Sequence, residues 1–159
     1  MHSVHRRTWA LLLCGLGVQA AAGTAVIVTA GRLDAYAFRS LDAGEYHRLA
    51  LNLARHGVFS GEAGPPWTPD TWRTPGYPLV LAPLAFVFGE SPIPMILFQQ
   101  ILRAVNVCLL YVGACRWLGS NRSFVAALLF LCEPYGIYYS FWLMSETWFI
   151  TVLLLCWLA

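Results

Sequence analysis

The sequence predicts an all-α, polytopic membrane protein with one long polar loop. Apolar residues make up 58% of the 159-residue chain and charged residues only 11%, a balance that a water-soluble domain of this length does not need. Several stretches are apolar enough for helices that cross a hydrocarbon core, which takes about 20 residues. Most of the charges, with clustered Gly and Pro, fall in residues 31–91, which we expect to be a loop outside the membrane.

The first expected span covers residues 9–30, which carry no charge. A cleaved signal peptide is the alternative, because His5, Arg6 and Arg7 precede the apolar run. The run is, however, longer than the ~7–15 apolar residues of such a peptide. The second expected span covers residues 92–118 and is followed by a tight polar turn.

The remaining segment, from Ser123 to Ala159, is too long for one span. As a single helix it would extend about 55 Å, against ~30 Å of hydrocarbon, so it has to fold back. We expect a third span over residues 123–143, bent at Pro134, and a fourth over 146–159 that begins on the loop side. The fourth is too short to cross, so the sequence is interpreted as the N-terminal part of a longer protein.

The loop contains an expected amphipathic helix over residues 42–57. One apolar stripe lies at helical offsets of zero, three, four and seven: Tyr46, Leu49, Ala50 and Leu53. Gly57 is expected to end this helix, which would lie flat on the membrane surface. Residues 78–89 are apolar but too short to span, and predict an interfacial or re-entrant piece.

The distribution of arginines predicts the orientation. Arg6 and Arg7 precede the first span, and Arg116 and Arg122 flank the turn after the second. The positive-inside rule places both groups in the cytoplasm, and long loops translocate largely regardless of their charge. Residues 31–91 are therefore expected to be extracytoplasmic, in a multi-pass protein of the cell or inner membrane.

The start of the loop helix holds a candidate general base. Asp42 and Glu45 are three residues apart and Tyr46 follows, giving a DxxxY pattern. One interpretation is structural, because an Asp with a Glu three residues on resembles a capping box, and carboxylates are favoured at helix starts. The other is catalytic, since a carboxylate at a membrane surface can accept a proton from a hydroxyl or amine acceptor.

Arg73 begins the stretch RTPGYP, in the most polar part of the chain. Its guanidinium either ties the loop down through a surface ion pair, which contributes little free energy, or presents its fork of donors to a phosphate. Pro75 and Pro78 stiffen the chain after it, and Gly76 allows backbone angles that other residues resist. The side chain is thus expected to be held in place.

Polar residues also occur inside the second span. Gln99, Arg103 and Asn106 are four and three residues apart and share one helix face. A charge at this depth is costly and needs a partner, for which Glu133 and Glu146 are the available acids. Two roles remain open: an Arg103–Glu133 ion pair that fixes helix register, or the lining of a polar site.

Several other functions lack support in the sequence. No motif indicates a nucleotide pocket or a serine hydrolase, and a formal charge of +2 does not suggest a nucleic-acid partner. His47 and His56 are nine residues apart, so shared metal ligation is not expected. The cysteines lie in apolar runs without CxxC spacing and are expected to pack inertly: Cys14, Cys108, Cys115, Cys132 and Cys156.

Five features follow one another in order: a first span, LDAGEYHRLALNLARHGVFS, TWRTPGYPLVLAPL, a polar-faced second span, and the P…LMSETWF opening of the fourth. In this order they resemble the N-terminal part of the GT-C membrane glycosyltransferases, over residues 9–159. The likeness is to the bacterial branch related to dolichyl-phosphate-mannose protein mannosyltransferases and to the aminoarabinose transferase that modifies lipid A.

The resemblance implies roles for individual residues. Asp42 matches a loop Asp that acts as base or organises the acceptor, and Arg73, with Tyr77 near it, resembles the basic residue that contacts the phosphate of the lipid-linked donor. Glu146 stands where the family has a second acidic residue, and because a Glu replaces the Asp of some members, a divalent-metal requirement stays open. Beyond these matches, Glu45, Tyr46, Arg103 and Glu133 are expected to support the site, and Glu133 has no counterpart in the family.

The implied reaction transfers a sugar from a polyprenyl phosphate to a lipid, glycan or protein acceptor, with Asp42 as base and Arg73 stabilising the departing phosphate. A transporter or structural subunit is the alternative, in which Arg103, Glu133 and Glu146 line a path or lock helices together. Transporter sites tend to lie between repeated halves, and no internal repeat is visible. A fragment that is inactive by itself is the third hypothesis.

Overall fold

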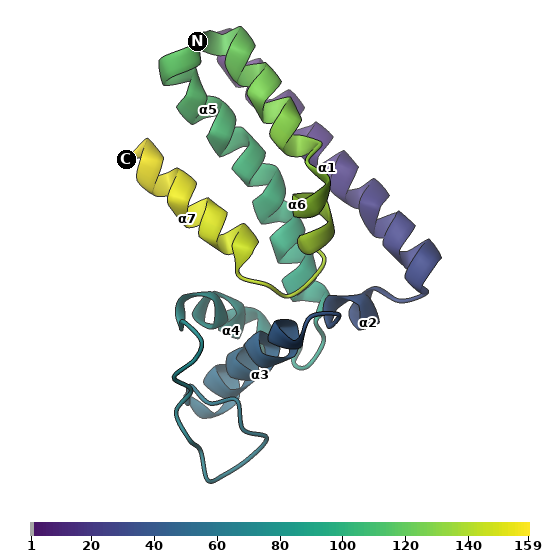
Figure 1. Ribbon diagram of the computed structural model, residues 1–159, viewed down its shortest axis with the longest axis vertical. Helices are drawn as coiled ribbons and strands as arrows, with labels where there is room; N and C mark the ends of the chain where they lie inside the picture. The colour runs from purple at the N-terminus through teal and green to yellow at the C-terminus, as the bar shows by residue number, and fades with distance from the viewer. Residues whose placement is uncertain (1) are drawn as a thin grey trace.

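The computed structural model describes residues 2–159, and every regular element in that range is helical (Figure 1). This confirms the all-α class. The helices are α1 (His2–Ala30), α2 (Leu33–Ala37), α3 (Leu41–His56), α4 (Gly76–Phe88), α5 (Ile93–Leu131), α6 (Pro134–Tyr139) and α7 (Glu146–Leu158). Helices α1, α5 and α7 form a bundle, and α3 and α4 pack together at one end of it.

Two helices have the length and composition to cross a membrane: Val4–Ala30 of α1 and Ile93–Leu131 of α5. Helix α5 is divided at Gly119, whose φ of 72° is not helical, so its second part runs back beside the first (Figure 1). Arg7 donates hydrogen bonds to Ser120 Oγ (2.8 Å) and Asn121 Oδ1 (2.9 Å). The start of α1 and the turn in α5 therefore lie at the same end of the bundle.

The segment expected as one span over residues 123–143 is interrupted. Helix α5 ends at Leu131, and α6 begins at Pro134, which has no N–H group to continue the helical hydrogen bonds. The Glu133 carboxylate caps α6 by accepting from the N–H groups of Tyr135 (2.8 Å) and Gly136 (2.5 Å). A turn then leads into α7, which begins at the α3–α4 end of the bundle.

The polar face of α5 binds backbone carbonyl groups at this interruption. The Gln99 amide donates to the carbonyls of Ser140 (3.0 Å) and Trp142 (2.7 Å), and the Gln100 amide donates to Ser140 (2.6 Å). Asn106 donates to the carbonyl of Thr147 (3.1 Å), in the first turn of α7. Because unpaired peptide groups are costly in apolar surroundings, these side chains hold the 140–147 segment against α5.

Arg103 has the same role, which corrects the expected ion pair with the Glu133 carboxylate. Its Nη2 donates to the backbone carbonyls of Phe130 (3.0 Å) and Glu133 (3.2 Å), while the Glu133 side chain caps α6. The guanidinium is buried, with 3% of the residue exposed, and lies 4.9 Å from the centre of the Phe130 ring. Carbonyls at the end of α5 and at the N-cap of α6 thus provide the partners that its charge requires.

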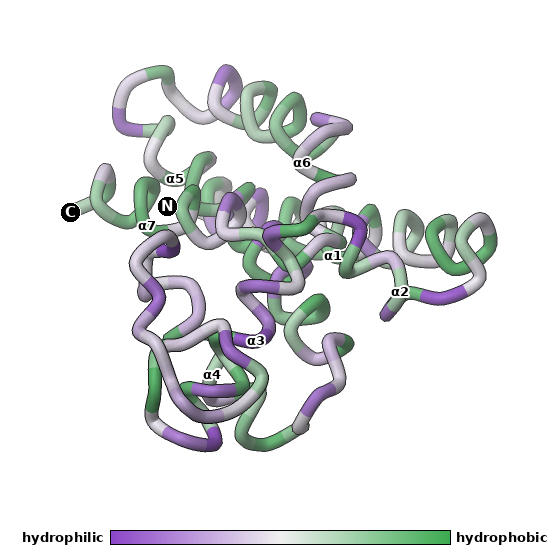
Figure 2. Tube along the Cα trace, turned by 60° about the horizontal axis from the view of Figure 1, so that its bottom comes forward, coloured by the Kyte–Doolittle hydropathy of each residue, from purple (hydrophilic) through white to green (hydrophobic). Residues whose placement is uncertain are grey.

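The residues of the long loop form a packed unit around α3 and α4. As the sequence predicts, α3 ends at Gly57, whose φ is 68°. Its apolar stripe, however, is buried against α4 in a core with Tyr77, Leu81 and Ala85. The stripe therefore packs on α4 and not on lipid, while the position of α3 at the membrane surface stays a prediction. Figure 2 shows the hydrophilic residues gathered in this part of the chain and the bundle mostly apolar.

We expect Gly136→Ala to destabilise the fold through Arg103. A Cβ at Gly136 would lie between 2.4 and 2.8 Å from the atoms of the guanidinium, which would have to leave its two carbonyls. The expected loss is about 2–3 kcal/mol, measured as a lower melting temperature of the detergent-purified protein. Gly17→Ala is the control, since a Cβ there meets nothing within 4 Å; equal melting temperatures would contradict this role of Arg103.

Candidate functional site

Arg73 joins the long loop to the start of α3 through two carboxylates. Its Nη2 lies 2.5 Å from Asp42 Oδ1 and 2.7 Å from Glu45 Oε2, and its Nε donates to the same Glu45 oxygen at 2.7 Å. The Arg73 side chain is 24% exposed and the two carboxylates are 40% and 43% exposed. Three of the residues singled out in the sequence therefore form one cluster, open to its surroundings.

Neither carboxylate caps α3, so the capping-box interpretation is wrong. The N-cap is Ser40, whose side chain makes no capping hydrogen bond. Asp42 lies in the first turn and Glu45 follows three residues later, on the same helix face. Both carboxylates turn to Arg73, and the site lies at the helix end that favours negative charge.

A turn in the loop sets the position of Arg73. Asp70 Oδ1 accepts hydrogen bonds from the N–H groups of Trp72 (3.0 Å) and Arg73 (2.8 Å). The Asn52 amide of α3 donates to the carbonyls of Ser60 (2.6 Å) and Glu62 (2.9 Å), which ties the preceding part of the loop to the helix. Arg73 is thus held in place through its backbone N–H group by Asp70 and through its guanidinium by Asp42 and Glu45.

The cluster has an uneven charge balance. Its two carboxylates and one guanidinium sum to a formal charge of −1. The hydrogen bond to Glu45, with Asp42 adding to it, raises the pKa of Arg73 above its ordinary value, so the guanidinium stays charged. Its Nη1 group and the Oδ2 atom of Asp42 form no hydrogen bond with the described residues.

A hollow of about 410 Å³ lies between the start of α4 and α7. Its nearest link to the cluster is Thr74, which follows Arg73 in the chain; Asp42, Glu45 and Arg73 themselves do not line it. Its polar part is lined by Thr74, Ser145 and Glu146, and its apolar part by residues further along α7: Trp148, Phe149 and Val152. The hollow is therefore amphiphilic, with charged and hydroxyl groups at the α7 N-terminus and hydrocarbon along the helix.

Tyr46 connects the cluster to the hollow. The Arg73 guanidinium lies 5.5 Å from the centre of its ring, and its hydroxyl lies 3.4 Å from Ser145 Oγ. The ring also packs edge-on against Tyr77, with centroids 5.1 Å apart, and Tyr77 lines the hollow. Asp42, Glu45, Tyr46, Arg73, Tyr77 and Glu146 are thus brought together from three helices and the loop.

The Tyr77 hydroxyl is not free to bind a phosphate. The residue is 2% exposed, and its hydroxyl donates a hydrogen bond to Gln99 Oε1. Burial, with the charge of Glu146 adding to it, raises the pKa of Tyr77 well above its ordinary value, so the phenol remains a donor. Its ring forms part of the wall, while its oxygen is used by α5.

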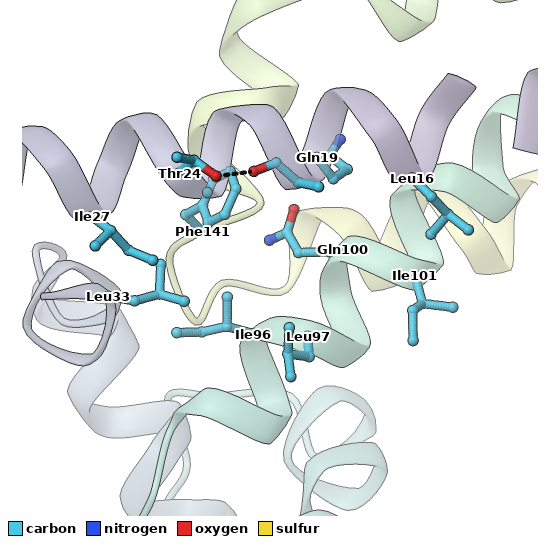
Figure 3. A pocket seen from close by; sticks show the side chains of 12 residues that line it. Leu16, Gln19, Thr24, Ile27, Leu33, Ile96, Leu97, Gln100, Ile101 and Phe141 are labelled. Carbon is cyan, nitrogen blue, oxygen red and sulfur yellow. Dashed lines mark hydrogen bonds between the residues drawn. The ribbon is translucent and has the colours of Figure 1, made fainter. Parts of the chain in front are cut away.

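Arg103 and Glu133 lie outside this site, because both are engaged by backbone groups at the interruption after α5. A second hollow, also about 410 Å³, lies between α1 and α5 (Figure 3). It is mainly apolar, with Gln19 and Gln100 among its lining residues, and it contains none of the residues singled out in the sequence.

Sequence analysis missed four residues that the site uses. Ser145 and Thr74 each directly follow or precede a residue that it did select, and Trp148 lies two residues after Glu146. Asp70, three residues before Arg73, was also missed, although an Asp at this spacing is typical of a turn that binds its own backbone. Local spacing could have found Asp70, but the contact of Thr74 with α7 needs the tertiary fold.

No group of three or more His, Cys, Asp or Glu side chains that could hold a metal ion occurs among the described residues. The Asp42–Glu45 pair supplies two carboxylates, fewer than such a group of three. Comparison of the chain with protein-family models, curated proteins and solved structures finds no match.

We expect Arg73→Gln to loosen the end of the loop without unfolding the protein. Ion pairs at partly exposed sites contribute about 1 kcal/mol or less, which corresponds to roughly fivefold faster hydrogen exchange at residues 70–74. Arg55→Gln is the control, because it breaks the Arg55–Glu90 pair, whose side chains are 45% and 72% exposed. The same exchange rate at residues 70–74 in both variants would exclude Arg73 as the tether.

Proposed function

We propose that this chain is a multi-pass membrane protein of the glycosyltransferase class that transfers a sugar from a polyprenyl phosphate to an extracytoplasmic acceptor. The observation that carries the proposal is the amphiphilic hollow beside the Asp42–Arg73 pair. An ionisable cluster next to a polar mouth and a hydrocarbon wall suits a ligand with an anionic head and an apolar tail.

The placement in a membrane has support at both ends of the bundle. Exposed tyrosines lie on α6: Tyr135, Tyr138 and Tyr139, of which Tyr138 packs edge-on against Tyr36 of α2 with ring centroids 5.9 Å apart. With Trp142 they form a cluster of aromatic contacts, as is typical of the boundary between lipid and water. Arg7 lies at the opposite end with the α5 turn, which the positive-inside rule assigns to the cytoplasm.

The donor would lie with its phosphate between the loop and the N-terminus of α7. Thr74 and Ser145 offer hydroxyl groups there, and Arg73 has an Nη1 group without a hydrogen bond to the described residues. Arg–phosphate hydrogen bonds are among the stronger charge-assisted interactions. The polyprenyl tail would follow Phe149 and Val152 along α7 into the bilayer.

In the proposed reaction Asp42 removes the proton from the acceptor as the acceptor atom bonds to the anomeric carbon. The bond between that carbon and the phosphate oxygen breaks, and its electron pair leaves with the phosphate. Arg73 stabilises the charge that grows on this leaving group. A divalent cation would find Asp42 and Glu45 as ligands and would need the phosphate as another, a combination typical of Mg²⁺.

The path-lining form of the transporter alternative has less support, whereas a helix-locking role agrees with the contacts of Arg103. Arg103 and Glu133, its expected path-lining residues, bind backbone groups of the same bundle instead. Of the three charged residues named for such a path, Glu146 lines the hollow between α4 and α7. The polar groups of α5 are explained by the interruption after Leu131.

We expect the purified protein in nanodiscs to bind undecaprenyl phosphate at least about tenfold more tightly than the uncharged alcohol undecaprenol, because only the phosphate meets Arg73. Native mass spectrometry measures both. Arg73→Gln should remove most of this preference, whereas the control Arg55→Gln should retain it. Equal binding of the two lipids by the unaltered protein would contradict the proposed donor site.

We expect Asp42→Asn to separate binding from chemistry. It removes a negative charge beside the phosphate, so the affinity for undecaprenyl phosphate should stay the same or rise. Loss of the general base should lower sugar transfer by about 100-fold or more, measured in membranes with labelled polyprenyl-phosphate sugars. Glu62→Gln, a carboxylate of the loop outside the cluster, is the control; unchanged transfer in Asp42→Asn would exclude it as the base.

A further inference from the structure

A third hollow is lined by two exposed arginines. It has a volume of about 480 Å³ and lies where the segment after α2 meets the first turns of α3. Arg39 and Arg48 line it, and so do Ser40 and His47. It shares no lining residue with the proposed donor hollow, so the two are separate.

The two arginines have no acidic partner. Within residues 4–159, whose side chains the structure describes, neither guanidinium forms an ion pair or a side-chain hydrogen bond. Arg39 lies 4.6 Å from the centre of the Tyr36 ring, which limits its movement. The nearby carboxylates Asp34 and Asp42 are already paired with other arginines, so the rim of this hollow keeps its positive charge.

The floor of the hollow contains an unsatisfied polar group. His47 is only 8% exposed, and its Nε2 has no hydrogen-bond partner. Phe38 packs edge-on against the imidazole, with ring centroids 5.1 Å apart. Burial lowers the pKa of His47 from its ordinary value, so the ring is neutral. Unpaired polar atoms are uncommon in protein interiors and call for an explanation.

The remaining features of the hollow favour an anion. It adjoins the N-terminus of α3, a helix of 16 residues, where backbone N–H groups and the helix dipole attract negative charge. The side chain of the N-cap Ser40 is not used to cap the helix. The rim also bears exposed apolar side chains, Leu41 at 91% and Phe38 at 38%, which would be suited to the acyl region of a lipid.

We propose that the Arg39–Arg48 hollow binds the phosphate of an anionic phospholipid from the membrane that surrounds the bundle. The two guanidinium groups would take the phosphate oxygens, and Leu41 and Phe38 would contact the acyl chains. This inference rests on the membrane placement proposed above but not on sugar transfer. A lipid bound here would fix the N-terminus of α3, the helix that bears Asp42, relative to the bilayer surface.

The test compares phospholipids on the full-length protein by native mass spectrometry. We expect phosphatidylglycerol to bind at least about tenfold more tightly than phosphatidylcholine, and the double variant R39Q/R48Q to lose this difference. R6Q/R122Q is the matched control: it removes two arginines at the other end of the chain's bundle and should retain the preference. Equal losses in the two double variants would overturn the site.

Further binding measurements distinguish a lipid site from a site for soluble phosphate and from the donor site. Inorganic phosphate at millimolar concentration should not displace phosphatidylglycerol; displacement would identify a site for soluble phosphate and overturn the lipid assignment. R39K/R48K keeps both charges and should retain most of the preference, because Lys and Arg attract an anionic headgroup alike through their charge; its complete loss would contradict an electrostatic lipid site. Binding of undecaprenyl phosphate by R39Q/R48Q should be unchanged, so failure of this proposal and failure of the donor site are told apart.

Discussion

The structure depends on the polar side chains of α5 that bind backbone carbonyls at the interruption between α5 and α7. In apolar surroundings an unpaired carbonyl costs several kcal/mol. Gln99 and Gln100 donate to the carbonyls of the 140–142 turn, and Arg103 donates to the carbonyls of Phe130, at the end of α5, and of Glu133, the N-cap of α6. The side chains that looked out of place inside an apolar helix are the ones that allow the chain to turn there.

This constraint also positions the candidate site. Gln99 accepts a hydrogen bond from Tyr77 through its oxygen, while its nitrogen holds the turn before α7. One buried amide therefore links α4 to the segment that presents Ser145 and Glu146. The hollow between α4 and α7 has its shape because both walls are attached to the same residue of α5. The polar contacts that shape the site are thus made by residues other than its proposed reacting groups.

The sequence predicted features that depend on short-range chemistry. The stripe that includes Tyr46 and Leu49, the stop at Gly57 and the break at Pro134 follow from helical spacing and backbone restrictions. It could not predict what covers an apolar face, since periodicity does not show whether lipid or α4 does so. One of the two roles expected for Arg103 was an ion pair with a carboxylate, because backbone acceptors at a helix end cannot be recognised from the sequence.

The Arg73 cluster makes a particular order of events possible in the proposed reaction. With two carboxylates and one guanidinium, the cluster is net negative, and Asp42 is occupied by a hydrogen bond to Arg73. An arriving phosphate that binds Nη1 would also compete for Nη2, and loss of the one hydrogen bond from Nη2 to Asp42 would make the carboxylate more available as a base. The base would therefore become active only when the leaving group is in place, because one arginine serves both.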